Sequence, residues 1–168
     1  MSNIKFGGEP VEVSGRIPEV GEKAEDFSFV KEDLSDGSLS DYQGKTKVII
    51  AIPSIETGVC QKEARTFNEQ LNDLENVVGL VVSKDLPFAL KRFCEAEGLN
   101  DVIAISDFRY NDFGNQYNLE MTSLAFKGLF ARVVFVLDGN NNIVYKEEVG
   151  EIGHEPNYEA AMAAVKKL

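Results

Sequence analysis

Residues 53–60 read Pro-Ser-Ile-Glu-Thr-Gly-Val-Cys and separate two segments with different hydrophobic patterns. Before them, residues 47–52 form a short run rich in β-branched residues, which is typical of a strand buried on both faces. Pro53 cannot continue a central strand, so the strand is expected to end there. After them, a helical face is predicted from apolar residues at spacings of three and four, namely Val59, Ala64, Phe67, Leu71 and Leu74. Cys60 therefore falls in the first turn of a helix that follows a buried strand.

The position of Cys60 favours a reactive thiolate. Only the deprotonated sulfur is a good nucleophile, and the first turn of a helix offers it unpaired N–H groups and the positive end of the helix dipole. Thr57 lies one turn earlier, where its hydroxyl could hydrogen-bond the sulfur or an oxygen bound near it. Pro53 can shield the sulfur from bulk water. The alternative is that Cys60 is a small buried hydrophobe, but that role needs neither Pro53 nor Thr57.

The whole chain has the composition of one globular domain spanning residues 1–168, with 168 residues and 43% hydrophobic content. The amino terminus has no apolar signal-peptide core, and no apolar run approaches membrane-spanning length. With two cysteines, a reducing cytoplasmic location is expected. The formal net charge of -11 argues against nucleic acid and anionic membrane surfaces as partners.

Outside the 53–60 stretch, the chain shows alternating strand and helix patterns. Residues 4–13 predict a small β-hairpin around Gly7-Gly8-Glu9-Pro10, and residues 39–44 predict a turn. Further strands are expected at residues 27–30, 77–83, 102–105, 130–137 and 143–149, the last two joined by a hairpin turn at 138–141. Further helices are expected at residues 86–97, 109–117 and from Tyr158 to the carboxyl end.

The pattern Pro-x-x-x-Thr-x-x-Cys resembles the peroxidatic-cysteine motif of peroxiredoxins. The full string at residues 53–60, with Arg65, Phe67 and Asn68 following, resembles the thiol peroxidase branch of that family. The order of elements is similar to a thioredoxin-like fold with the peroxiredoxin insertion. This resemblance implies an α/β protein whose central mixed sheet is flanked by helices. Thiol peroxidases also carry an N-terminal β-hairpin, to which residues 1–15 correspond as an extension of the domain.

The resemblance implies roles for particular residues. Cys60 would reduce hydrogen peroxide or an organic hydroperoxide and become a sulfenic acid. Cys94 would attack that sulfenic acid to form an intrachain disulfide, which thioredoxin would reduce. Arg132 would stabilise the thiolate and polarise the peroxide, which gives a reason for a charge near an apolar strand. No metal, haem or flavin cofactor is implied, and family members are often homodimers.

Several alternatives remain open at the level of the sequence. Cys94 lies at the border of an apolar helical face and could be a packing residue, and Arg132 could be a strand-end residue that reaches solvent. Arg65 is expected to be structural and to pair with a carboxylate. His154 is expected in an exposed loop, although a cysteine hydrolase would need it as a base beside Cys60. A thioredoxin-fold redox sensor that uses the same disulfide as a switch is the non-enzymatic alternative.

Overall fold

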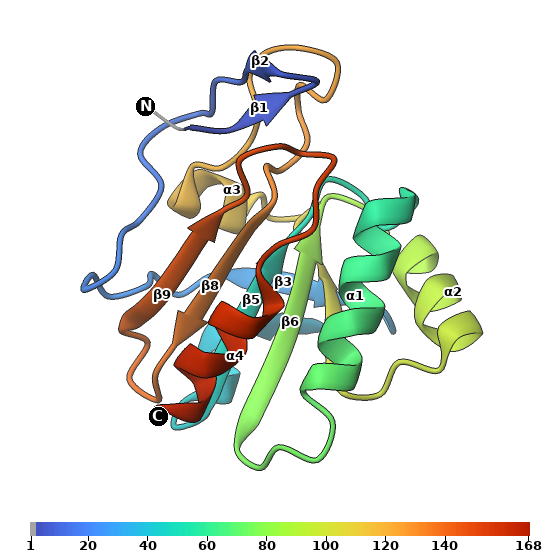
Figure 1. Ribbon diagram of the computed structural model, residues 1–168. Coiled ribbons are helices and arrows are strands. Elements are labelled where there is room, and N and C mark those ends of the chain that lie inside the picture. Colours follow the sequence, from blue (N-terminus) through green and yellow to red (C-terminus); the bar gives the residue numbers. More distant parts are fainter. Residues whose placement is uncertain (1–2) are drawn as a thin grey trace.

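The strand predicted before Pro53 lies in the middle of a seven-stranded mixed sheet. The computed structural model describes residues 3–168, and in it this strand is β5, Thr46–Ala51. The strand order is β4 (Asp36–Ser38), β3 (Ser28–Lys31), β7 (Val102–Ser106), β6 (Val77–Ser83), β5, β8 (Val133–Leu137) and β9 (Ile143–Glu148). Strands β5, β6 and β7 are parallel to one another, whereas β8 and β3 join them antiparallel on either side. The β3–β4 and β8–β9 hairpins therefore lie on either side of the three parallel strands β5, β6 and β7 (Figure 1).

The remaining elements follow the predicted order of strands and helices. The helices are η1 (Leu39–Tyr42, a 3-10 helix), α1 (Gly58–Gln70), α2 (Pro87–Glu97), α3 (Asp112–Tyr117) and α4 (Tyr158–Lys166). The predicted α/β fold with a central mixed sheet and flanking helices is confirmed.

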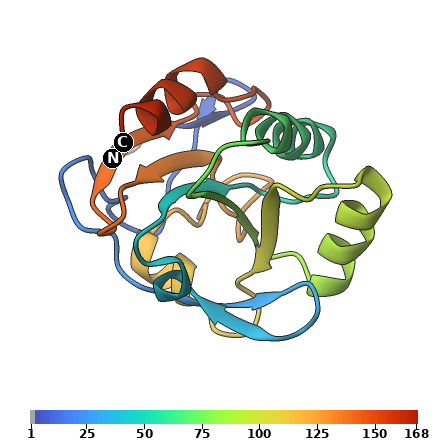
Figure 2. The ribbon, with the colours of Figure 1, turned by 90° about the horizontal axis from the view of Figure 1, so that it is seen from below.

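The helices cover both faces of the sheet, so β5 is buried on each side. Val48, Ile50 and Ile52 pack in the layer beneath α1, α2 and α4, whereas Ile49 and Ala51 point into the opposite layer with α3. Figure 2 shows α1 and α4 on one side of the sheet and α3 on the other. This double burial explains why residues 47–52 are continuously apolar after Lys47 instead of alternating with polar residues.

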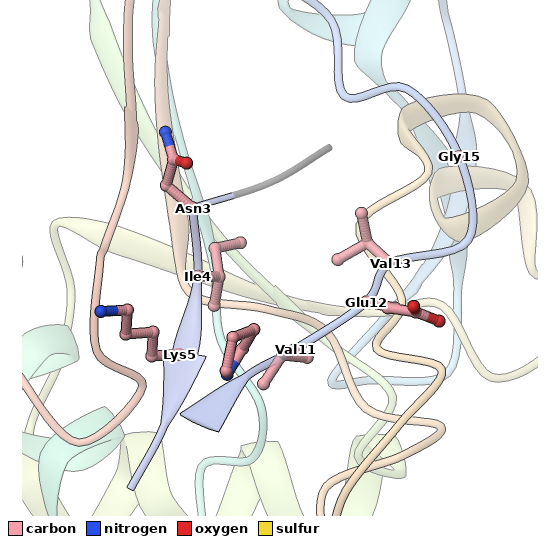
Figure 3. Close-up of a pocket in the computed structure, with 8 residues that line it drawn as sticks. Asn3, Ile4, Lys5, Val11, Glu12, Val13 and Gly15 are labelled. Carbon is pink, nitrogen blue, oxygen red and sulfur yellow. The ribbon is translucent and has the colours of Figure 1, made fainter. Parts of the chain in front are cut away.

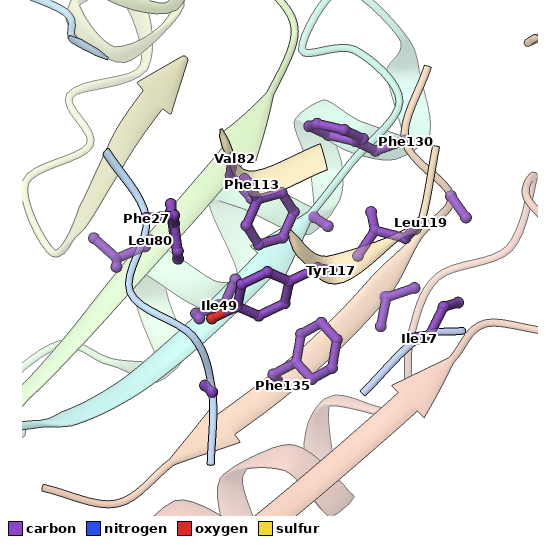
Figure 4. Packing of buried hydrophobic residues seen from close by; sticks show 14 of the residues in the cluster. Ile17, Phe27, Ile49, Leu80, Val82, Phe113, Tyr117, Leu119, Phe130 and Phe135 are labelled. Carbon is purple, nitrogen blue, oxygen red and sulfur yellow. The ribbon is translucent and has the colours of Figure 1, made fainter. Parts of the chain in front are cut away.

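The layer beneath α3 is built around aromatic rings. Phe113 and Tyr117 of α3 stack with ring centroids 4.5 Å apart, and Phe27, Phe130 and Phe135 meet them edge-on (Figure 4). The Tyr117 hydroxyl donates to the Glu25 carbonyl at 2.8 Å, so this buried polar group is satisfied. The packing anchors α3 firmly to the sheet opposite the helix that carries Cys60.

Two predicted elements begin three residues later than expected, and the helix predicted to include Leu71 and Leu74 ends at Gln70. The helix expected at residues 109–117 begins only at Asp112, because Asn111 has a left-handed backbone (φ 53°) and Asp107 accepts the N–H groups of the helix start at Phe113 and Gly114. The strand expected at 130–137 begins at Val133, because residues 130 and 131 pair with the segment around Leu119 instead of with β5. The short strand β4 was not predicted.

The N-terminal hairpin forms a small sheet of its own. Strands β1 (Lys5–Phe6) and β2 (Glu9–Pro10) pair antiparallel around Gly7 and Gly8, and residues 1 and 2 of the predicted extension lie outside the described residues. Ile4 and Val11 are buried in the main core, which ties the hairpin to the rest of the protein. A cavity of about 750 Å³ lies along the hairpin and the segment that follows it (Figure 3). Its lining contains none of the residues predicted to act in chemistry.

Candidate active site

Cys60 lies where the sequence places it, at the start of a helix that follows the central strand. Thr57 is the N-cap of α1, with an extended backbone (φ -98°, ψ 148°), and Cys60 is the third residue of the helix. Pro53 is buried just after β5. The Cys60 side chain has no solvent exposure, and its thiol is free. The sulfur is therefore held near unpaired helical N–H groups and away from bulk water.

The loop between β5 and α1 is fastened by a carboxylate from the neighbouring strand end. Ser54 Oγ donates to Asp85 Oδ1 at 2.7 Å, and the backbone N–H of Ile55 donates to Asp85 Oδ2 at 2.7 Å. Ser83 Oγ donates to the same Oδ2 at 2.7 Å. Because β5 and β6 are parallel neighbours, their carboxyl ends meet at one edge of the sheet. Asp85 thereby fixes the backbone that leads into the Cys60 helix.

Arg132 is the charged partner of the Cys60 sulfur. Its Nη1 donates to Cys60 Sγ at 3.3 Å and to Glu63 Oε2 at 2.7 Å. Its Nε and Nη2 donate to the Ile152 carbonyl at 3.0 and 2.8 Å. Only 2% of the residue is exposed, so the alternative of an arginine that reaches solvent is wrong. All three guanidinium nitrogens are engaged, which fixes the charge beside the sulfur.

Glu63 belongs to the site and was missed in the sequence analysis. It lies one helical turn after Cys60, is fully buried, and forms an ion pair with Arg132. Burial raises the pKa of Glu63 above its usual value, although the neighbouring guanidinium opposes the shift. Among the described residues, its Oε1 has no hydrogen-bond partner. A charged residue on the same face as Cys60, Ala64 and Phe67 was the available signal in the sequence.

The Thr57 hydroxyl is oriented as an acceptor toward the site. Thr57 Oγ1 donates its proton to the Ser54 carbonyl at 2.9 Å. The donor is therefore occupied, and a hydrogen bond from this hydroxyl to the Cys60 sulfur is not formed. The oxygen lone pairs remain to accept a hydrogen bond from a molecule bound in the adjacent cavity.

A cavity of about 540 Å³ opens next to these groups. Its lining joins the start of α1 with the hairpin tip and the segment after β9, and consists of Phe6, Gly7, Thr57, Gly58, Val59, Phe126, Arg132, Glu151, Ile152, Gly153 and His154. His154 is exposed, as expected, and lies in this lining. The cavity offers a small molecule the guanidinium of Arg132 and the hydroxyl of Thr57, with apolar surface around them.

Cys94 lies in a different environment. It is 7% exposed on α2, where its thiol interacts with Glu32 of the turn between β3 and β4. Burial, with the Glu32 carboxylate as a further cause, raises the pKa of the Cys94 thiol to about 12. The thiol is free, like that of Cys60. In this arrangement, the described neighbours of Cys94 disfavour its thiolate.

The two cysteines are not positioned for a disulfide in this structure. Helices α1 and α2 start at the same edge of the sheet, with Cys60 the third residue of α1 and Cys94 the eighth of α2. At 1.5 Å per residue, the two are offset by about 7 Å along their helices. A disulfide needs Cα atoms within about 7 Å, so this offset alone reaches the limit, and the lateral separation of the two helices adds to it.

Arg65 is a surface residue without contact to the sulfur. Its Nη1 lies 3.3 Å from Glu97 Oε1, which confirms the expected ion pair with a carboxylate. A second exposed pair, Arg92 with Glu56 at 2.7 Å, also joins α2 to the Cys60 region. No group of three or more potential metal-ligating side chains is found within residues 3–168, and no helix there is long and apolar enough to cross a membrane.

The fold and the buried cysteine–arginine pair define a thiol-based redox protein with a thioredoxin-like architecture. The sequence profile of the Redoxin family matches residues 19–162, and the chain belongs to this family. A thiol peroxidase of Streptococcus pneumoniae is 50% identical over 165 residues, which cover 98% of this chain and 99% of that protein. A thiol peroxidase of Leptospira interrogans is 45% identical over 166 residues, covering 98% and 97% of the two chains.

A solved structure supports the same grouping. A peroxiredoxin-like protein from Aquifex aeolicus superposes with a TM-score of 0.93 at 38% identity, covering 98% of this chain and 95% of the other. A thiol peroxidase from Chromobacterium violaceum has a TM-score of 0.88 over 98% and 95% of the chains. At 20% identity, that second likeness shows the fold alone.

Proposed function

We propose that this protein is a thiol-dependent peroxidase that reduces hydrogen peroxide and organic hydroperoxides at Cys60. The observation that carries the proposal is the contact of 3.3 Å between Arg132 Nη1 and Cys60 Sγ in a buried site. A fixed guanidinium stabilises negative charge on the sulfur and on the oxygen that leaves. The same chemistry is named in the relatives that are 45–50% identical over nearly the whole chain.

The first step is a two-electron oxidation of Cys60. The thiolate attacks the terminal oxygen of the hydroperoxide, a sulfur–oxygen bond forms and the oxygen–oxygen bond breaks. The leaving oxygen takes up a proton and departs as water or an alcohol, and the sulfur becomes a sulfenic acid. Arg132 donates to the reacting atoms, and Thr57 accepts from the hydroperoxide O–H, because its own proton is held by Ser54. Pro53 keeps water from the sulfur.

The second step uses Cys94 as the resolving cysteine. Its sulfur attacks the Cys60 sulfenic acid, a disulfide forms within the chain, and water leaves. An external dithiol of the thioredoxin type reduces this disulfide and restores both thiols. Because Cys60 is fully buried and lies five helix positions before the level of Cys94, we expect the first turn of α1 or part of α2 to unfold locally. Unfolding of α2 would also take Cys94 away from Glu32 and so remove one cause of its raised pKa.

Peroxide consumption by cysteine variants tests the proposal. Stopped-flow measurements should show that Cys60→Ser abolishes reduction, whereas Cys94→Ser reacts once and accumulates a sulfenic acid that dimedone traps. Only the wild type should turn over continuously with thioredoxin. A protein that oxidises once and does not turn over with any dithiol would instead be a redox sensor. Complete loss of the single turnover in Cys94→Ser would contradict the assigned roles.

We further propose that residues 1–168 act as one domain in the cytoplasm and assemble as a homodimer. Leu86 and Phe88 at the start of α2 are 51% and 65% exposed, and a second copy would cover this apolar surface. Sedimentation analysis of wild type and Phe88→Asp checks the assembly. A wild type that is monomeric at micromolar concentration would refute it.

A further inference from the structure

The tip of the N-terminal hairpin is part of the active-site wall. Phe6 and Gly7 line the same cavity as Thr57 and Arg132. The Phe6 ring packs edge-on against Phe126, with centroids 4.7 Å apart, and this ring also lines the cavity. Figure 1 shows the hairpin above the ends of β8 and β9, at the edge of the sheet where α1 begins. The hairpin is therefore close enough to affect the chemistry without supplying a polar side chain to it.

The hairpin is joined to the segment after β9 by backbone hydrogen bonds. The N–H of Lys5 donates to the Gly150 carbonyl at 2.9 Å, and the N–H of Ile152 donates to the Lys5 carbonyl at 2.9 Å. Lys5 and Glu151 form a parallel bridge. Residues 150–152 are thus held as an added strand against β1, which restrains their position on the hairpin side.

The Glu151 carboxylate also joins the hairpin to the segment after β9. Glu151 accepts from the N–H of Gly7 at 3.1 Å and from the N–H of Gly8 at 2.8 Å. Both glycines have positive φ, 59° and 84°, which turns two successive N–H groups toward the same anion. These hydrogen bonds lower the pKa of Glu151 below its usual value, so the carboxylate is ionised at neutral pH. The tip of the hairpin and residue 151 are therefore fastened by a charge-assisted contact.

The next residue along the chain holds the guanidinium. The Ile152 carbonyl accepts from Arg132 Nε at 3.0 Å and from Nη2 at 2.8 Å, while its N–H is bonded to Lys5. One residue therefore connects the hairpin on one side with Arg132 on the other. The remaining nitrogen, Nη1, is the one that meets Cys60 and Glu63. A displacement of the Ile152 carbonyl would rotate the guanidinium and move Nη1 away from the sulfur.

We propose that the N-terminal hairpin positions Arg132 for catalysis, through Glu151 and the backbone of Ile152. This inference rests on the proposed peroxidase function and adds a positioning residue, Glu151, to it. Glu151 acts through Arg132 and does not touch the reacting atoms. Because small misplacements of a catalytic group are costly, loosening this junction should slow the reaction of Cys60 with peroxide by roughly tenfold.

The test compares Glu151 with Asp138, because each carboxylate accepts hydrogen bonds from two backbone N–H groups of a turn. Glu151→Ala removes the acceptor of the Gly7 and Gly8 N–H groups, and Glu151→Gln keeps its shape. The control is Asp138→Ala, since Asp138 accepts the N–H groups of Asn140 and Asn142 at 2.9 Å in the turn at the far end of β8. Thermal unfolding first establishes that each variant is folded. Single-turnover rates with peroxide are then measured across a pH series.

The expected result separates positioning from stability. Glu151→Ala should slow the reaction about tenfold and move the acid limb of the rate profile to higher pH, because the thiolate is less well stabilised. Glu151→Gln should recover part of the rate, and Asp138→Ala should destabilise the fold with its rate and pH profile unchanged. An unchanged rate and profile in folded Glu151→Ala would overturn the inference.

A double variant shows whether the effect passes through the guanidinium. In an Arg132→Gln background, Glu151→Ala should cause no further loss of rate, because the group that it positions is already absent. An equal further loss would overturn the inference. If Arg132→Gln slows the reaction and Glu151→Ala does not, the inference fails and the proposed function stands. If Arg132→Gln itself has no effect, the catalytic role of Arg132 fails as well.

Discussion

Cys60 and Cys94 are both buried thiols on helices that cover the same face of the sheet, yet their neighbours carry opposite charges. Cys60 lies 3.3 Å from the guanidinium of Arg132, in the first turn of its helix. Cys94 lies in the third turn of α2 beside the Glu32 carboxylate. Burial alone disfavours an anion in both places, and only Cys60 has a cation and helix N–H groups to offset it.

The difference assigns the order of events in the reaction. Burial and the Glu32 carboxylate raise the pKa of the Cys94 thiol, so it carries little thiolate at neutral pH, and we expect peroxide to oxidise Cys60 first. In the proposed mechanism, Cys94 reacts only after the sulfenic acid has formed, when local unfolding of α1 or α2 brings the two sulfurs together. The reduced fold therefore protects one sulfur and activates the other, and each of the following experiments changes one side of this contrast.

Removing the guanidinium of Arg132 should have the largest effect on the reaction of Cys60 with peroxide. Arg132→Gln is expected to slow the reaction of Cys60 with peroxide by about 10²–10³-fold, as for loss of a fixed donor in an oxyanion site. It should also destabilise the fold by about 3 kcal/mol, because Glu63 is left buried without its partner. Stopped-flow kinetics and urea unfolding measure the two effects. The double variant Arg132→Gln with Glu63→Gln should recover much of the stability and none of the rate.

Removing the Glu63 carboxylate, which competes with the Cys60 sulfur for Arg132, should have a smaller effect on the peroxide reaction, and its direction can be predicted. Glu63 and the Cys60 thiolate share Arg132, so at pH values where Glu63 is ionised, Glu63→Gln should stabilise the thiolate and move the peroxide rate profile to lower pH. The pH series used for the wild type detects this. A shift to higher pH would mean that Glu63 acts mainly by orienting Arg132.

The Glu63 carboxyl should also make the free energy of unfolding depend on pH. Because burial raises the pKa of Glu63 in the folded state, from 4.5 to about 7, the folded protein keeps a proton that the unfolded chain has released. Its contribution to stability is therefore present below about pH 4.5 and is lost as pH rises toward 7. Urea unfolding across this window should show a smaller decline in Glu63→Gln than in the wild type.

The Glu32 carboxylate should account for only part of the low reactivity of the Cys94 thiol. Burial is the larger cause of the raised pKa, so Glu32→Gln in a Cys60→Ser background should speed alkylation of Cys94 roughly threefold, or about half a pKa unit. Glu95→Gln, which removes an exposed carboxylate next to Cys94 in sequence, is the matched control and should change little. Equal effects of both variants would show that only the general negative charge matters.

The smallest effect is expected for the other arginine near the site. Arg65 pairs with Glu97 at 3.3 Å, with both side chains more than a third exposed. Arg65→Gln should therefore change the free energy of unfolding by less than about 1 kcal/mol and the peroxide rate by less than twofold. A rate loss comparable to that of Arg132→Gln would show that Arg65, on α1, is a second catalytic cation beside Arg132.

The sequence by itself determined the elements and the position of the nucleophile. A continuous apolar run, a proline and a helical periodicity placed Cys60 at the start of α1, because strand and helix patterns depend on neighbours a few residues apart. The same local rules predicted the N-terminal hairpin, the β8–β9 hairpin and the order of the other elements, but not the β3–β4 hairpin. They failed at residues 109–111 and 130–132, where Asp107 and the segment around Leu119 take over the backbone hydrogen bonds.

Only the tertiary structure decided which groups surround each sulfur. Arg132 is 72 residues from Cys60 and 69 from Glu63, and no spacing rule relates positions that far apart. The fastening of the Ser54 loop by Asp85, and of Arg132 by a carbonyl held to the hairpin, likewise depends on strands meeting at one edge of the sheet. Because charge stabilisation acts through space, the chemistry of each of these two buried cysteines is set by the groups that folding brings to it.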